Sequence, residues 1–257
     1  MIYDVFINNF QVFLVVFARL IGLFVTAPFF SGMAIPMTMR LGLTFFVSLI
    51  STPLVLSLNF QAAPDLASYG VQLISNFLIG AGIGFFAFII VSGFQVSAQV
   101  FSIPMGLGMS EVVDPMSSME LPAIGNLVGV LVLFLLIRVD GHFYLIHLIV
   151  NSFHSLTVLS FQSLQTLEQG LSAAVMIMFD TSLRIALPVI AITLILDMAM
   201  GLISRVAPQF NVMIMGFNVK LLAGFVVLWL AMPAIADLGV MLINGLLNTA
   251  RELLRLM

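Results

Sequence analysis

The sequence contains no cysteine. This absence excludes disulfide bonds, thiolate metal ligands and cysteine nucleophiles together. Charge is also scarce, because only 7% of the 257 residues are charged and a single lysine, Lys220, stands beside seven arginines. A water-soluble domain carries about 25% charged residues. The chain is therefore too poor in charge to cover a soluble surface.

Hydrophobic side chains take the place of the missing charges and make up 62% of the chain. One compact core cannot hide so many apolar side chains from water, so much of the surface must itself be apolar. The surrounding medium is therefore lipid or the apolar surface of other proteins. The net charge of −3 gives no indication of a nucleic-acid partner. The opening Met-Ile-Tyr-Asp lacks the basic start of a cleavable signal peptide, so we expect the N-terminus to be retained.

Six apolar runs approach or exceed the roughly 20 residues that a helix needs to cross a bilayer. They extend from Phe10 to Met33, Leu41 to Leu58, Val71 to Gly93, Ala123 to Ile149, Leu171 to Met200 and Val212 to Ala236. Breaks are expected between them at 31–36, 59–64, 104–122, 160–170 and 205–211. Backbone groups in lipid must be satisfied within their own segment, and no run shows the alternation of a membrane β-barrel. The predicted fold is an all-α membrane protein of helical hairpins.

The C-terminal segment, residues 237–257, differs in kind from these runs. Its apolar residues recur at intervals of three and four, with Asn, Arg and Glu between them. This pattern predicts an amphipathic helix. Such a helix lies on a membrane surface, on a partner or on the chain's own bundle, and the pattern leaves these alternatives open.

Several charged residues lie inside or beside the apolar runs, where each costs about 2.5–3.5 kcal/mol at mid-bilayer on insertion scales. They are Arg19, Arg138, Asp140, Asp180, Arg184 and Asp197. Asp180 and Arg184 stand four residues apart and share one helix face, so they can neutralise each other. Two interpretations remain open: a coupling-ion or proton site, or an ion pair that fixes helix register at a subunit contact.

Neither a metal site nor an enzyme is predicted. The histidines His142, His147 and His154 follow one another at five and seven residues, so a helix does not gather all three on one face. The sequence shows no Ser/His/Asp arrangement, Walker loop or dinucleotide fingerprint. Glycines four apart, at 80 and 84 and at 125 and 129, instead indicate close helix contacts.

The stretch 104–122 is bounded by prolines and is rich in methionine. Its methionines and leading glycines are Met105, Gly106, Gly108, Met109, Met116 and Met119. Long segments without regular structure are uncommon in compact folds and are usually functional or disordered. Methionine is flexible and polarizable, so a cluster of methionines can seal around objects of varying shape. An ordinary flexible loop is the alternative.

Three nearby stretches resemble the signature region of the FliR family, whose counterparts in virulence secretion systems form the SctT family. They are Ala186 to Asp197, Gly201 to Asn211 (with Arg-Val-Ala-Pro-Gln-Phe-Asn) and Gly216 to Lys220 (Gly-Phe-Asn-Val-Lys). Near the N-terminus, Phe17 to Gly22, Ala27-Pro-Phe-Phe and Ile35 to Leu43 are similar to the family's opening. The resemblance extends nearly from end to end.

The resemblance implies a non-enzymatic subunit of a flagellar type III protein export gate in the bacterial inner membrane, within the flagellar basal body. Family members assemble with FliP and FliQ, are joined by FlhB and FlhA, and pass unfolded substrates without a cofactor. By the same resemblance, residues 1–170 are FliP-like, and residues 171–257 are a FliQ-like hairpin with the C-terminal helix.

The resemblance also suggests roles for individual residues. The segment with Met105, Gly106, Gly108, Met109, Met116 and Met119 corresponds to a plug in the closed pore. Candidates for subunit contacts are Arg19, Asp180, Arg184, Asp197, Arg205 and Lys220. Two other functions stay open beside this one: a secondary transporter with Asp180, Arg184 and Asp197 as ligands near the midplane, and a purely structural membrane scaffold.

Overall fold

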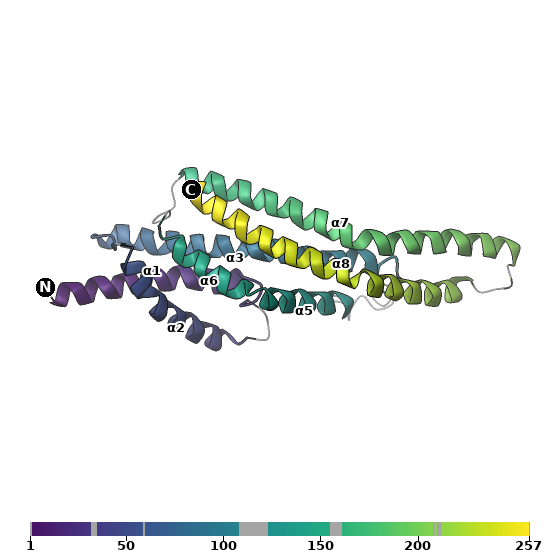
Figure 1. The fold of residues 1–257 in the computed structure, drawn as a ribbon, viewed down its shortest axis with the longest axis horizontal. Helices are drawn as coiled ribbons and strands as arrows, with labels where there is room; N and C mark the ends of the chain where they lie inside the picture. Colours follow the sequence, from purple (N-terminus) through teal and green to yellow (C-terminus); the bar gives the residue numbers. More distant parts are fainter. Residues whose placement is uncertain are drawn as a thin grey trace. The chain divides into compact units, whose positions relative to one another are not determined.

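The structure is a computed structural model and describes residues 2–31, 35–58, 60–107, 123–154, 161–207, 209 and 212–256. Within these ranges it is all-helical, with no strand. The helices are α1 (Ile2–Thr26), α2 (Met37–Leu56), α3 (Leu66–Ser102), α5 (Ala123–Arg138), α6 (Gly141–Asn151), α7 (Phe161–Val206) and α8 (Val212–Leu256) (Figure 1). Five are long and apolar enough to cross a membrane, and α5 with α6 makes a sixth if they count as one span. The predicted all-α membrane fold is confirmed.

The chain divides into two compact units. The first comprises Met1–Ile90, Leu136–Val175 and Leu242–Met257, and the second comprises Val91–Leu135 and Met176–Met241. Helices α3, α5, α7 and α8 each contribute residues to both. The division at about residue 170 into FliP-like and FliQ-like parts concerns sequence relatedness, not compactness, and stays a prediction.

In the first unit, α1 and α3 approach so closely that only glycine fits between their backbones. A Cβ on Gly80 would fall on the carbonyl oxygen of Arg19, and a Cβ on Gly22 would fall on that of Phe77. Thr26 Oγ1 lies beside Gly84 and donates to the carbonyl oxygens of Gly22 and Ala81, each at 3.0 Å. Small residues let helix backbones approach in an apolar medium, where water does not drive helices together. The close contact predicted at glycines 80 and 84 is confirmed.

Helix α2 turns its polar face inward and its apolar face outward. The buried hydroxyls of Thr44, Ser48 and Thr52 donate to the carbonyl oxygens four residues earlier, at 2.6–2.8 Å. These bonds satisfy the hydroxyls inside the unit. The exposed face carries Leu41, Leu43, Phe45, Phe46, Leu49, Ile50 and Leu54. A soluble protein has the opposite arrangement, so α2 fits lipid or an apolar partner as its surroundings.

The apolar run from Ala123 to Ile149 is predicted as one span, but the structure breaks it. Helix α5 ends at Arg138 and α6 begins at Gly141, with a bend of 64° between Gly125–Arg138 and Gly141–Asn151. Asp140 occupies the break in the left-handed backbone region, with φ 56°. Asp tolerates this conformation better than most side chains. The hydropathy of the run conceals the break because apolar residues flank it on both sides.

In the second unit, the C-terminal part of α7, from Met176, and most of α8 form a hairpin (Figure 1). Its outer residues are apolar and exposed. The α8 members are Met215, Val219, Leu222, Phe225, Val226, Trp229, Leu230 and Met241. Lys220 Nζ pairs with Asp197 Oδ1 and so links the two helices. Helix α3 approaches α7 at Gly93, where a Cβ would lie 2.9 Å from the carbonyl oxygen of Met178.

Several helix boundaries differ from the ends of the predicted runs. Helix α7 begins at Phe161, so Gly170 lies within a helix and not in a break. Helix α3 continues to Ser102, nine residues beyond the predicted end at Gly93, since hydroxyls there bond to their own helix, as Ser97 Oγ does to the carbonyl oxygen of Phe94. The C-terminal segment continues α8 without a break up to Leu256. The side chains of its last turns lie outside the described residues, so its predicted amphipathic faces stay a prediction.

Candidate functional site

The methionine-rich stretch begins at the C-terminal cap of α3. The Leu107 N–H donates to the Ser102 carbonyl at 3.0 Å, and the Gly106 N–H donates to the Ile103 carbonyl at 2.9 Å. This pair of bonds is a Schellman motif, which ends a helix with a residue in the left-handed region. Gly106 supplies that residue, with φ +87°. The cap fixes where the chain leaves α3 and enters the stretch.

The same cap lies directly on α8. Met105 is fully buried, and a Cβ on Gly224 would lie 2.5 Å from Met105 Cε and 2.8 Å from its Cγ and Sδ. A Cβ on Gly106 would lie 2.7 Å from Cδ2 of the Phe217 ring. All four residues belong to the second unit. We call this set, Met105, Gly106, Phe217 and Gly224, the α8 anchor.

The α8 anchor includes two of the six predicted plug residues. Met105 packs on Gly224 and Gly106 packs on the Phe217 ring, so closely that a Cβ on either glycine would lie under 3.0 Å from the other side chain. The other four, Gly108, Met109, Met116 and Met119, lie outside the described residues. What the structure describes is therefore the attachment of the methionine-rich stretch at its N-terminal end.

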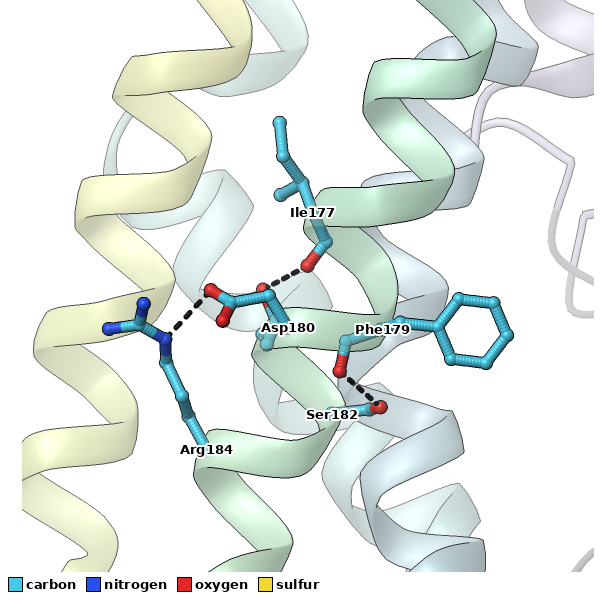
Figure 2. Close-up of polar contacts among 6 residues, drawn as sticks. Ile177, Phe179, Asp180, Ser182 and Arg184 are labelled. Carbon is cyan, nitrogen blue, oxygen red and sulfur yellow. Dashed lines mark hydrogen bonds and ion pairs between the residues drawn. The ribbon is translucent and has the colours of Figure 1, made fainter.

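Asp180 and Arg184 form the ion pair expected from their spacing. Arg184 Nε donates to Asp180 Oδ2 at 2.7 Å, on the opposite side of α7 from the Phe179 ring (Figure 2). Both side chains are about 60% exposed, at 60% for Asp180 and 63% for Arg184. Nearby hydroxyls are satisfied within the helix, as for Ser182 Oγ, which donates to the Phe179 carbonyl at 2.9 Å (Figure 2). The pair is thus presented outward by an otherwise apolar helix.

Three further charged candidates of the second unit, Asp197, Arg205 and Lys220, differ in their surroundings. Lys220, paired with Asp197, keeps 21% of its side chain exposed and Asp197 keeps 48%. Arg205 is exposed in the last turn of α7. The ion pair with Lys220 involves Oδ1 of Asp197, and about half of the Asp197 side chain stays accessible.

Arg19 lies in the interior of the first unit and has no exposed surface. Its Nε donates to Asn76 Oδ1 at 2.8 Å and its Nη1 donates to Ser152 Oγ at 2.7 Å. The guanidinium also lies 3.7 Å from the centroid of the Phe153 ring, a cation–π contact. Arg19 joins α1 and α3 to the turn that follows α6. Its described contacts are within its own chain, although the sequence made it a candidate for a subunit contact.

Sequence patterns did not reveal the partners in the α8 anchor. Phe217 and Gly224 lie in an apolar run that holds other glycines and aromatics, and no spacing relates them to residue 105. The predicted glycine contact at 129 is made with a side chain, since a Cβ there would lie 2.7 Å from Gln95 Nε2. Across the part of the chain that the structure describes, no group of three His, Asp or Glu residues is placed to hold a metal ion.

A model of the family described as "Bacterial export proteins, family 1" matches residues 10–246. This range includes nearly all of the chain, with the α8 anchor and every charged candidate residue inside it.

Curated relatives match over similar lengths. The chain is 28% identical to the "Flagellar biosynthetic protein FliR" of Escherichia coli (strain K12), over 92% of this chain and 90% of the relative. It is 26% identical to the protein of that name from Bacillus subtilis (strain 168), over 97% of each. Identity to the one from Caulobacter vibrioides is also 26%, over 91% of this chain and 94% of the relative. Each alignment extends across both units.

Proposed function

The chain belongs to the bacterial export proteins, family 1, and from this membership we propose that it is a channel-forming subunit of the flagellar type III protein export gate. The names of its family and relatives indicate a membrane component of the flagellar export apparatus. The proposal adds the bacterial inner membrane as its location and unfolded flagellar proteins as the substrates that pass through. The chain itself acts without an enzymatic step or a cofactor.

The single observation that carries the proposal is the family match along residues 10–246. The outward apolar face of α7 and α8 supports it further, because a face of this size needs lipid or protein against it. The exposed Asp180–Arg184 pair favours protein, since charges facing hydrocarbon are costly. We assign this face to contacts with FliP-like and FliQ-like subunits, with FlhB-like and FlhA-like components joining the assembly. In this assignment residues 171–257 act as the FliQ-like part.

Co-expression with the FliP-like and FliQ-like proteins of the same genome tests this assignment. We expect the chain to be recovered in detergent as one hetero-oligomer with both, and poorly when expressed alone. A chain that is stable alone, remains unassociated in their presence and binds a small solute would favour the transporter. An open groove of about 840 Å³ lies between α2 and α6, and none of the transporter's proposed ligands, Asp180, Arg184 and Asp197, lines it.

The methionine-rich stretch is assigned the role of a plug that closes the pore between rounds of export. The α8 anchor supports this role, because it fixes one end of the stretch to α8, a helix apolar enough to cross a membrane. Methionine side chains are flexible enough to deform around a substrate. Closure then depends on Met105 remaining seated against Gly224. A side chain at position 224 would displace it.

Ion leakage through the assembled complex tests the plug. Deletion of residues 105–119 should give the largest leak, and Gly224→Ala should give a smaller one because Met105 loses its space. Gly216→Ala is the matched control on the same helix, since a Cβ there would meet Met200 Cε at 3.6 Å and Cγ at 3.9 Å, which are ordinary contact distances. A fully assembled deletion variant that does not leak would refute the plug.

A further inference from the structure

Helix α8 contacts α7 near the end of the hairpin, inside the second unit. Lys220 Nζ pairs with Asp197 Oδ1, and a Cβ on Gly216 would lie 3.6 Å from Met200 Cε. The two contacts are three residues apart on α7 and four apart on α8, the spacing of one helix face in each partner. Together they fix the position of α8 along α7 and its rotation about its own axis.

Lys220 lies between the two α8 members of the α8 anchor. Phe217 precedes it by three residues and Gly224 follows it by four, so the three residues share one side of α8. Gly224 is buried, and Phe217 and Lys220 are partly covered. Val219 and Leu222, on other sides of the helix, are exposed. A rotation of α8 that moves Lys220 away from Asp197 therefore also moves the anchor residues away from the cap of α3.

The ion pair is placed to resist such a rotation. Lys220 is the only lysine of the chain and stands in an apolar run. Only 21% of its side chain is exposed, so loss of the Asp197 carboxylate would leave a mostly covered ammonium group without its partner. The Asp180–Arg184 pair is about 60% exposed at both side chains and belongs to the exposed class that contributes little. The Asp197–Lys220 pair is thus the stronger restraint on the hairpin.

The α8 anchor tolerates little movement of α8. Met105 is fully buried and its Sδ lies 2.8 Å from the position that a Cβ on Gly224 would take, while the Phe217 ring lies equally close to Gly106. A gap of about 0.5–1 Å already forfeits a quarter to a half of the attraction between two packed atoms. A small displacement of α8 is therefore enough to unseat Met105.

We propose that the Asp197–Lys220 ion pair holds the α8 anchor closed, by fixing the rotation of α8 that presents Phe217 and Gly224 to the cap of α3. When the pair breaks, α8 turns, Met105 leaves its seat and the methionine-rich stretch is released at its N-terminal end. The inference rests on the proposed function, because this release matters only if the stretch plugs a pore. It deepens that function by naming the pair that regulates the plug. Asp197 and Lys220 are positioning residues, which act on the anchor through α8.

Ion leakage through the assembled complex tests the proposal. Lys220→Met removes the charge but keeps most of the side chain, and it should raise the leak to a level below that of the deletion of residues 105–119. Lys220→Arg is the matched control, because it keeps the charge, and its complex should stay tight. Exchanging the two charges, with Asp197→Lys and Lys220→Asp in one chain, should reduce the leak relative to Lys220→Met.

A single introduced cysteine reports on the seat of Met105 directly, because the chain has no native cysteine. Met105→Cys should react slowly with a water-soluble maleimide while the pair is intact, since this position is fully buried. Adding Lys220→Met should raise the rate roughly tenfold, less than loss of a fully buried pair would give, because Asp197 is half exposed. Ser97→Cys, at another fully buried position of α3, is the matched reporter, and its rate should not change.

Recovery of the complex and the leak of the 105–119 deletion are measured in the same series. If the unaltered chain forms no complex, or if the deletion does not leak, the proposed function or its plug fails and this inference fails with it. The inference fails alone if the deletion leaks but Lys220→Met stays tight or no longer assembles, or if the charge exchange leaves the leak unchanged. Reaction rates at position 105 that do not respond to Lys220→Met, or that rise equally at position 97, would also overturn it.

Discussion

Helix α3 and the α7–α8 hairpin are comparably apolar but are covered to very different extents. In the apolar window of α3, 61% of the residues are buried by the chain itself, against 22% for α7 and 11% for α8. Helix α3 meets α1 through glycines that allow backbone contact, whereas α8 presents Trp229 and Leu222 outward. Hydropathy therefore shows that a helix avoids water. Glycine contacts and exposed residues show whether its own chain covers it.

The α1–α3 contact and the α7–α8 hairpin therefore have different roles. The α1–α3 contact gives the first unit its own core, held by backbone proximity and by Arg19. The outward face of α7 and α8 has too little cover from its own chain and is complete only against other molecules. Substitutions should accordingly destabilise the chain in the first region and the assembly in the second.

The largest effect on chain stability is expected from Gly80→Ala. The added methyl group would collide with the Arg19 carbonyl and force α1 and α3 apart. We expect a loss in free energy of unfolding at or above the upper end of the ~1–3 kcal/mol that overpacking usually costs. Thermal unfolding of the purified protein in detergent measures it. Gly201→Ala on α7 is the control, because no described atom lies within 4 Å of its new Cβ; equal stability of the two variants would contradict the close contact.

The next effect is expected from Arg19→Met, which keeps the length of the side chain but removes the guanidinium. Asn76 Oδ1 and Ser152 Oγ would lose their donors in a buried site. Leaving a buried polar group unsatisfied costs about 1–3 kcal/mol. Thermal unfolding should show this loss, and Arg19→Lys should fall between the two proteins because lysine keeps the charge without the planar fork. Unchanged stability would show that the guanidinium does not hold these segments together.

The smallest effect on the chain, with a larger one on the assembly, is expected from Asp180→Lys. An exposed pair at this spacing contributes only about 0.3–0.5 kcal/mol, so the unfolding temperature should hardly change. Recovery of the complex should fall, and Arg184→Asp in the same chain should restore part of it. Glu168→Lys, also exposed on α7, serves as the control. Normal assembly with loss of export would instead point to transport chemistry at this pair.

How well each region can be predicted depends on how close in sequence the residues are that determine its structure. The apolar runs and the Asp180–Arg184 pair depend on residues close in sequence, so the all-α fold and this pair were predictable. The break at Asp140 was not, because it depends on one backbone conformation between two apolar segments. The seat of Met105 on Gly224 was not predictable either, because the two residues are far apart in sequence and a glycine in an apolar run carries no sign of its partner.

The position of Trp229 gives the most direct test of the central claim, that subunits of the export apparatus cover the α7–α8 face. Trp229 is 74% exposed and can be replaced by a photo-crosslinking phenylalanine analogue in native membranes. The same analogue at Phe94, which is 1% exposed on α3, should react only within the chain. We predict adducts between position 229 and another protein of the export apparatus. Adducts with lipid alone, in a complex that is otherwise intact, would contradict the account.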